Sequence, residues 1–124
     1  MEEVQEKIMY VLTCAAENPE RATMPWVLGN AALAMDVGAT VVLQGNGVYL
    51  AQKGYTDHMV SAHGFSPVKK LMSDFQELGG RILVCVPCIR ERNISETDLI
   101  EGTEPAAAGK VNAEAMESKA VFVY

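Results

Sequence analysis

The chain has 124 residues, of which 49% are hydrophobic, and its net charge at pH 7 is −6. This size and composition predict one globular domain over residues 1–124 and argue against intrinsic disorder. The acidic balance disfavours nucleic acid or an anionic membrane as a partner. No apolar run reaches the ~18 residues of a membrane span, and the acidic N-terminus has no signal-peptide pattern. We therefore expect a cytoplasmic protein.

The predicted elements alternate between strands and helices. Apolar, β-prone runs predict strands, and apolar residues at spacings of three and four predict helices. Glycine, proline and asparagine mark the turns between them. In chain order we expect a strand at 7–13, a helix at 20–37, a strand at 39–44, a short helix at 48–53, a polar, mobile loop at 54–65, a helix at 67–78, a strand at 81–86, a short helix at 87–92, a strand at 99–102, a helix at 106–118 and a strand at 120–124.

Three of the predicted helix ends rest on particular residues. Pro25 would interrupt a helix that starts near residue 20, so either Thr23 caps a later start or the first turn is kinked. Ser66 is expected to cap the next long helix, with Pro67 at its first position. Asn93 suits a left-handed residue at the end of the short helix that precedes it.

The order of these elements predicts the fold class. Strands that alternate with helices favour an α/β fold, here a three-layer α/β/α sandwich on a mostly parallel five-stranded sheet. The run at 81–86 is apolar almost throughout, as expected of a strand that is buried on both faces. The apolar strand at 120–124 predicts a terminus that is packed or capped by another subunit.

The three cysteines all fall at the edge where the carboxyl ends of parallel strands meet, which is where sites form in open α/β sheets. Cys14 follows the first predicted strand, and Cys85 and Cys88 lie at the end of the third. A thiol at the start of a helix faces unpaired N–H groups, which favour the reactive thiolate. The turn Gly45-Asn46-Gly47, after the second strand, can offer backbone N–H groups to a small ligand.

A structural role for these residues stays open. Free cysteines are often buried packing residues, and this applies to Cys14 and Cys85 in particular. Gly-Asn-Gly is typical of an ordinary tight turn, and Tyr49, Tyr55 and Trp26 suit packing or subunit contacts. A single Cys-x-x-Cys is a weak zinc motif, so we expect no metal, and both histidines fall on the polar loop.

Several segments, taken in order, resemble the DsrE/DsrF-like family over nearly the whole chain. They cover residues 11–13, 17–22, 45–50, 78–82, 84–88, 92–94, 98–102 and 120–124. The family includes YchN-like proteins, TusD-type sulfur carriers and single-chain members described as peroxiredoxins. The resemblance implies one DsrE/F-like domain with a three-layer α/β fold that assembles into homo-oligomers, often trimers or hexamers.

The resemblance also implies a chemistry. The better-understood members carry sulfur as a cysteine persulfide between donor and acceptor proteins, a relay that requires no cofactor. Their active cysteine ends the third strand, where this chain has Cys85, and the arginine that follows matches Arg92. Asn93 replaces the usual glycine, and Cys88 is an addition that makes a Cys-x-x-Cys pair. Together with the strand-end positions, this predicts two catalytic residues, Cys85 and Cys88, and five binding residues, Cys14, Asn46, Gly47, Tyr49 and Arg92.

Three functions are compatible with these features. The first is a sulfur carrier, in which Cys85 holds the persulfide and Cys88 releases the sulfur by forming a disulfide. The second is a thiol–disulfide redox protein that uses the same pair of cysteines. The third is a non-catalytic oligomeric module that binds a small ligand at the sheet edge and has unreactive cysteines.

Overall fold

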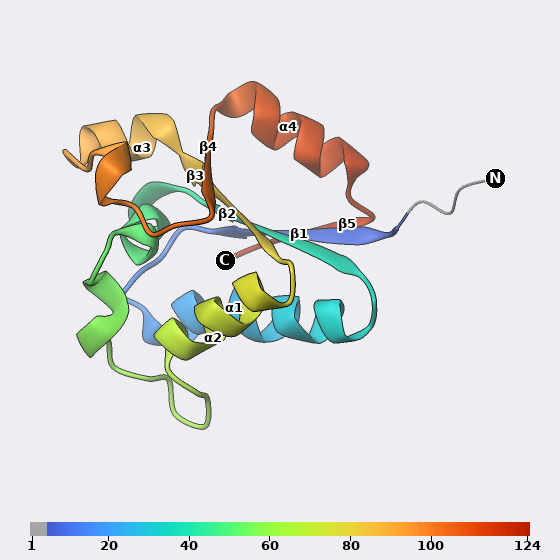
Figure 1. Cartoon of the computed structure of the whole chain (residues 1–124), viewed down its shortest axis with the longest axis horizontal. Helices are drawn as coiled ribbons and strands as arrows, with labels where there is room; N and C mark the ends of the chain where they lie inside the picture. The colour runs from blue at the N-terminus through green and yellow to red at the C-terminus, as the bar shows by residue number, and fades with distance from the viewer. Residues whose placement is uncertain (1–4) are drawn as a thin grey trace.

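The computed structural model describes residues 5–124, which fold around a five-stranded sheet in the order β4-β3-β2-β1-β5 (Figure 1). All neighbouring strands run parallel. Their bounds are β1 (Lys7–Leu12), β2 (Gly38–Leu43), β3 (Arg81–Cys85), β4 (Thr103–Ala106) and β5 (Ala120–Val123). The predicted α/β class and parallel sheet are therefore confirmed.

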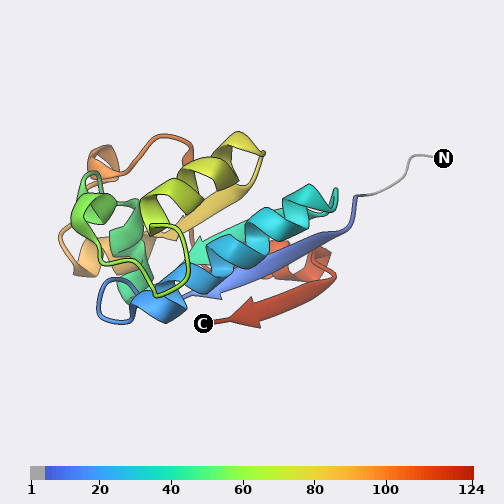
Figure 2. The same ribbon diagram turned by 90° about the horizontal axis from the view of Figure 1, so that it is seen from below.

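Helices on both faces of the sheet give the fold three layers. α1 (Pro19–Ala34) and α2 (Val68–Glu77) lie side by side on one face, as Figures 1 and 2 both show. α4 (Ala108–Glu117) covers the other face (Figure 1). The remaining short helices gather at the carboxyl ends of the strands: α3 (Val86–Glu91), η1 (Gly45–Ala51), η2 (Tyr55–His58) and η3 (Glu96–Asp98).

Two apolar clusters hold the layers together. The larger lies between the sheet and the pair α1 and α2, where the rings of Trp26 and Phe75 meet edge to face with centroids 5.4 Å apart. Both side chains are fully buried, and burial of one such side chain contributes roughly 1.5 to 3 kcal/mol. The smaller cluster, on the α4 face, contains Met9, Val11, Val42, Leu83 and Ala106. The central strands are thus buried on both faces, as their apolar sequences predict.

α1 begins at Pro19 because Asn18 caps it. The side-chain oxygen of Asn18 accepts a hydrogen bond from the backbone N–H of Arg21 at 3.2 Å. The helix continues through Pro25, which costs one backbone hydrogen bond. The expected later start at Thr23 is wrong, since the Thr23 hydroxyl donates to the carbonyl oxygen of Pro19 at 2.6 Å within the helix.

Other helix ends agree with the sequence only in part. α2 begins at Val68, and Pro67 occupies its cap position without a side-chain hydrogen bond, so Ser66 is not the cap that we expected. Asn93 has a φ of 57°, the left-handed conformation predicted for it. The polar stretch at 54–65 includes η2, a short 3-10 helix that the sequence does not predict.

The fourth strand lies later than the sequence indicates. Residues 99–102 form no strand, and Leu99 joins Gln52 in a single antiparallel bridge. β4 follows these residues and forms one edge of the sheet. An edge strand tolerates Pro105, because only one of its sides has to supply hydrogen bonds to a neighbour. Because β4 has a polar sequence, its residues do not show the apolar pattern of a strand. The apolar residues before it do show that pattern, so the strand was predicted four residues too early.

A charged cluster fastens α4 to the amino ends of the strands. Glu114 is only 5% exposed, and its carboxylate accepts a hydrogen bond from Thr40 Oγ1 at 2.7 Å. The same carboxylate lies 3.1 Å from Lys7 Nζ and 3.0 Å from Arg81 Nη1. Burial alone would raise the pKa of Glu114, but these three partners hold that pKa below its ordinary value. Glu114 is therefore a buried carboxylate that stays charged.

Candidate functional site

Cys85 is the last residue of β3 and immediately precedes α3, which begins at Val86. Its φ of −63° and ψ of 115° make it the cap residue, and Cys88 lies in the first turn of the helix. Both cysteines are free and half-buried. The two cysteines are three residues apart across this junction, so the strand-to-helix turn places both thiols at the same edge of the sheet.

The surroundings of Cys85 favour its protonated form. Burial raises the pKa of the Cys85 thiol above its ordinary value, and the hydrogen bond with the Cys88 side chain raises it further. The backbone N–H of Cys88 and the charge of Arg92 act in the opposite direction without reversing the shift. This differs from the thiolate expected at a helix start, because desolvation outweighs the nearby N–H groups.

Cys88 has a backbone donor from a distant segment. Its sulfur accepts a hydrogen bond from the N–H of Gly45 at 3.3 Å, although the two residues are 43 positions apart. Gly45 begins η1 and has a φ of +53°. Gly47 allows η1 to lie this close to the sheet, since a Cβ at that position would overlap the backbone carbonyl oxygen of Leu12. The glycine turn therefore directs an N–H group at a cysteine sulfur.

Arg92, at the end of α3, is held by three hydrogen bonds. Its Nε and Nη2 donate to Asn46 Oδ1 at 3.2 and 3.0 Å, and its Nη1 donates to the carbonyl oxygen of Cys88 at 3.1 Å. The guanidinium carbon also lies 5.9 Å from the ring centroid of Tyr49, within the range of a cation–π contact. A fixed positive charge thus stands beside the cysteine pair.

Glu17, in the loop after β1, completes a chain of polar contacts. Its carboxylate accepts hydrogen bonds from Asn46 Nδ2 at 3.0 Å and from the backbone N–H of Ala15 at 2.7 Å. Burial alone would raise the pKa of Glu17, but these bonds and the charge of Arg92 hold it below its ordinary value. Asn46 therefore joins a carboxylate to a guanidinium. We call Glu17, Gly45, Asn46, Cys85, Cys88 and Arg92 the cysteine site.

The structure brings most of the predicted site residues together. Direct contacts join Cys85, Cys88, Asn46, Tyr49 and Arg92. Gly47 acts through the backbone, by its close approach to Leu12. Cys14 is different: its sulfur lies 3.9 Å from Thr13 Oγ1. Among the hydrogen bonds of residues 5–124, none joins Cys14 to Cys85 or Cys88.

Two residues of this region were not predicted as functional. Glu17 follows the first strand, so its place at the carboxyl edge of the sheet was the available signal. The hydroxyl of Tyr55 accepts a hydrogen bond from the backbone N–H of Ala16 at 3.0 Å, and its ring stacks on Tyr49 with centroids 5.6 Å apart. Tyr55 thus supports Tyr49, which agrees with the packing role considered for both rings.

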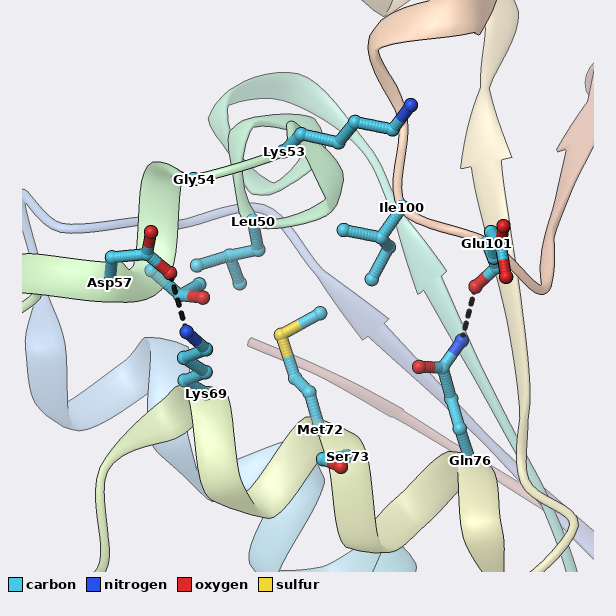
Figure 3. A pocket seen from close by; sticks show the side chains of 11 residues that line it. Leu50, Lys53, Gly54, Asp57, Lys69, Met72, Ser73, Gln76, Ile100 and Glu101 are labelled. Carbon is cyan, nitrogen blue, oxygen red and sulfur yellow. Dashed lines mark hydrogen bonds and ion pairs between the residues drawn. The ribbon is translucent and has the colours of Figure 1, made fainter.

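The prominent hollows of the surface lie away from the cysteine site. One cavity of about 370 Å³ is bounded by η1, η2, α2 and the segment before β4. Figure 3 shows its apolar side chains, Leu50, Met72 and Ile100, and the ion pair of Lys69 with Asp57 at 2.8 Å. An adjoining cavity of about 540 Å³ shares that ion pair. Neither cavity includes a cysteine, so the thiols are not enclosed by them.

The described residues were also compared with the requirements of a metal site and of a membrane-spanning helix. In the part of the chain that the structure describes, no three His, Cys, Asp or Glu side chains are grouped to hold a metal ion. His58 and His63 are both exposed, as expected of residues on the polar loop. Between residues 5 and 124, no helix combines the length and apolarity needed to cross a bilayer.

Curated relatives of similar sequence come from Methanocaldococcus jannaschii. Uncharacterized protein MJ0989 is 30% identical over 118 residues, which cover 95% of this chain and 99% of that protein. Uncharacterized protein MJ0760 is 31% identical over 103 residues, or 83% of this chain. The match spans only 37% of MJ0760, which is a much longer protein.

Solved structures of similar fold and a matching family profile are known. The YchN protein from E. coli has a TM-score of 0.80 at 16% identity, with 97% of this chain and 100% of that chain covered. MTH1491 from Methanobacterium thermoautotrophicum has a TM-score of 0.65 at 16% identity, with coverages of 98% and 100%. At such identities these likenesses concern the fold alone. The DsrE/DsrF-like family matches residues 6–124, and the chain is therefore a member of that family.

Proposed function

We propose that the protein is a sulfur-relay protein that carries a sulfane sulfur as a persulfide on Cys85. The observation that supports this most is the junction of β3 and α3, where Cys85 ends the strand, Cys88 lies in the first turn of the helix, and Arg92 is held beside them by Asn46 and the Cys88 carbonyl. Membership of the DsrE/DsrF-like family supports the same chemistry. The thiols themselves perform the reaction, so the proposal requires no metal or organic cofactor.

Loading is a displacement at sulfur. The Cys85 sulfur, once deprotonated, attacks the outer sulfur of a donor persulfide, R–S–SH. The S–S bond of the donor breaks, the R–S⁻ group leaves with the electron pair, and Cys85–S–SH forms. The guanidinium of Arg92, held by Asn46 and by the Cys88 carbonyl, stabilises negative charge on the carried sulfur. No net oxidation takes place.

The carried sulfur can leave Cys85 by two routes. In the first, the thiolate of an acceptor protein attacks the outer sulfur and leaves Cys85 as a thiolate. In the second, the Cys88 thiolate attacks the inner sulfur, so a Cys85–Cys88 disulfide forms and HS⁻ departs. A dithiol reductant then restores the two thiols. The surface position of the cysteine site, outside both cavities, suits hand-over between donor and acceptor proteins.

Residue-level mass spectrometry tests the proposal. The protein is incubated with glutathione persulfide, alkylated and digested, and the peptide with Cys85 is expected to gain the mass of one sulfur atom. Dithiothreitol should remove that mass. The Cys14→Ser variant is the matched control, and it should load normally because the hydrogen-bond partner of Cys14 is Thr13, outside the cysteine site. Absence of added sulfur on both Cys85 and Cys88 would overturn the proposal.

A second candidate function is thiol–disulfide exchange. The spacing of Cys85 and Cys88 across the start of α3 favours it, because disulfide formation requires two cysteines that are close in space. A reduction potential between about −120 and −270 mV supports a catalytic disulfide. A potential below about −300 mV indicates a disulfide too stable for exchange, and the sulfur-relay proposal then stands alone.

We also propose that the protein works as a homo-oligomer, as the resemblance to the family implies. β5 is an edge strand, and its side chains Val121, Phe122 and Val123 are 44%, 44% and 66% exposed. An open apolar edge favours pairing with another chain, and the occupant that we propose is a second copy of this chain. Light scattering should report an assembly that Val123→Lys weakens. Met116→Lys, at an exposed position of α4, is the control.

A further inference from the structure

The two thiols of the Cys-x-x-Cys pair lie in different surroundings. The Cys88 sulfur accepts the backbone N–H of Gly45 at 3.3 Å, and a hydrogen bond donated to sulfur stabilises negative charge on it. In the part of the chain that the structure describes, the Cys85 sulfur accepts no such hydrogen bond from a distant segment, and burial raises the pKa of its thiol, which favours the protonated form.

These contacts separate two tasks that a carrier has to perform. Accepting sulfur from a donor requires a nucleophile, which the negative form of a thiol provides. Storing sulfur does not require a stabilised thiolate, so Cys85, at the end of β3, can store it. The family pattern described above needs only the cysteine that ends the third strand, which leaves the accepting task to Cys88.

We infer that Cys88 is the thiol that takes sulfur from the donor, and that it then passes this sulfur to Cys85. The inference rests on the proposed persulfide function and replaces direct attack of Cys85 on the donor with loading through Cys88. The donor belongs to the class of persulfides, R–S–SH, whose outer sulfur is electrophilic. The geometry that carries the inference is the hydrogen bond from the Gly45 N–H to the Cys88 sulfur, at the sheet edge where β3 ends on Cys85.

The transfer takes two displacements. In the first, the Cys88 thiolate attacks the outer sulfur of R–S–SH, the donor S–S bond breaks, and R–S⁻ leaves with its electron pair to give Cys88–S–SH. In the second, Cys85 gives up its proton to solvent and attacks the outer sulfur of Cys88–S–SH. The products are Cys85–S–SH and the Cys88 thiolate, which again faces the Gly45 N–H. Each step breaks one S–S bond and forms one, so no oxidant is consumed.

A rapid-mixing time course tests this order. Full-length protein is mixed with glutathione persulfide at neutral pH, quenched with an alkylating agent, and analysed by mass spectrometry for sulfur on each cysteine. In the wild type, sulfur should appear on Cys88 first and on Cys85 afterwards. This part requires no variant, so it does not depend on how a substitution affects folding.

Two matched variants separate the roles of the thiols. In Cys88→Ser, loading of Cys85 should slow by about tenfold or more, because the thiolate nucleophile is absent. In Cys85→Ser, sulfur should appear on Cys88 and stay there, because the second displacement has no nucleophile. Circular dichroism checks that each variant is folded, and Cys88→Ala replaces any Cys88→Ser protein that is not.

The outcomes distinguish this inference from the function on which it rests. Loading of Cys85 at the wild-type rate in the Cys88 variants, or sulfur on Cys85 before Cys88 in the wild type, overturns the order and leaves Cys85 as a direct carrier. Absence of sulfur on both cysteines of the wild type overturns the persulfide function and this inference with it.

Discussion

Arg92 and Asn46 lie 46 residues apart in the sequence, and the guanidinium of Arg92 donates two hydrogen bonds to the side-chain oxygen of Asn46. The amide nitrogen of the same Asn46 donates to Glu17 at 3.0 Å. One neutral side chain therefore links the loops that follow β1 and β2 to the end of α3. The charge next to the cysteine pair is positioned by this link and not by α3 alone.

Arg92→Lys should reduce sulfur loading by about tenfold, because lysine keeps the charge but loses the planar fork that Asn46 and the Cys88 carbonyl hold. The free energy of unfolding should change by less than about 1 kcal/mol. Loading rates measured with glutathione persulfide check this prediction. Arg90→Lys is the control, since Arg90 is exposed on the same helix. Equal loading rates for the two variants would contradict a positioning role for Arg92.

Gly47→Ala should destabilise the protein by about 2 to 3 kcal/mol, because the new Cβ would overlap the carbonyl oxygen of Leu12 and push η1 away from the sheet. Gly109→Ala offers the opposite case, since a Cβ there meets open space and alanine stabilises a helix by up to about 1 kcal/mol. Chemical denaturation of both variants measures the difference. Similar free energies of unfolding would show that the close approach at Gly47 carries no strain.

Alkylation of Cys85 should rise only at a pH above that of an ordinary cysteine, because burial raises its thiol pKa. The groups that face it are Cys88 and Arg92. A raised pKa also means that the folded chain holds its proton longer than the unfolded chain. Stability should therefore be constant below the cysteine pKa of about 8.5 and should fall as the pH rises above it. Cys85→Ser should remove that part of the alkaline loss.

Glu114→Gln should destabilise the protein by about 2 to 3 kcal/mol, because Lys7, Arg81 and Thr40 lose a buried anionic partner. The lowered pKa of Glu114 predicts the pH dependence. Its stabilisation is complete above the ordinary glutamate pKa of about 4.3 and is lost as the pH falls through the lower, folded-state value. Denaturation across acidic pH should show a flatter slope for this variant. Glu117→Gln, at an exposed position, should keep the wild-type slope.

The fold could be predicted from the sequence because its main signals are local. The apolar run that ends at Cys85 indicates a buried strand by itself, and Asn93 marks the end of the helix that follows. β4 was missed because it is an edge strand with a neighbour on one side only. Such a strand can contain Pro105 and polar residues at little cost in stability, and these residues do not predict a strand. The start of α1 was predicted to within one residue of Pro19, and only the alternative of a later start at Thr23 was wrong, because Asn18 caps the helix and Pro25 lies inside it.

The site could be predicted only in outline. Strand ends locate Cys85, Cys88 and the glycine turn at one edge of the sheet, since parallel strands share that edge. Which of these residues touch depends on contacts between positions 29 to 46 residues apart, and no local pattern contains them. The protonated state of Cys85 depends on burial by other segments, so the helix start alone suggested the wrong state.

The hydrogen bond from Gly45 to Cys88 links thiol chemistry to the completeness of folding. Its donor belongs to the segment after β2 and its acceptor to the helix after β3, so it exists only when both segments have docked. A partly unfolded chain in which either segment is undocked lacks this hydrogen bond, and so does a peptide copy of residues 81–92. The bond is therefore a marker of native protein in a mixture of folded and unfolded chains.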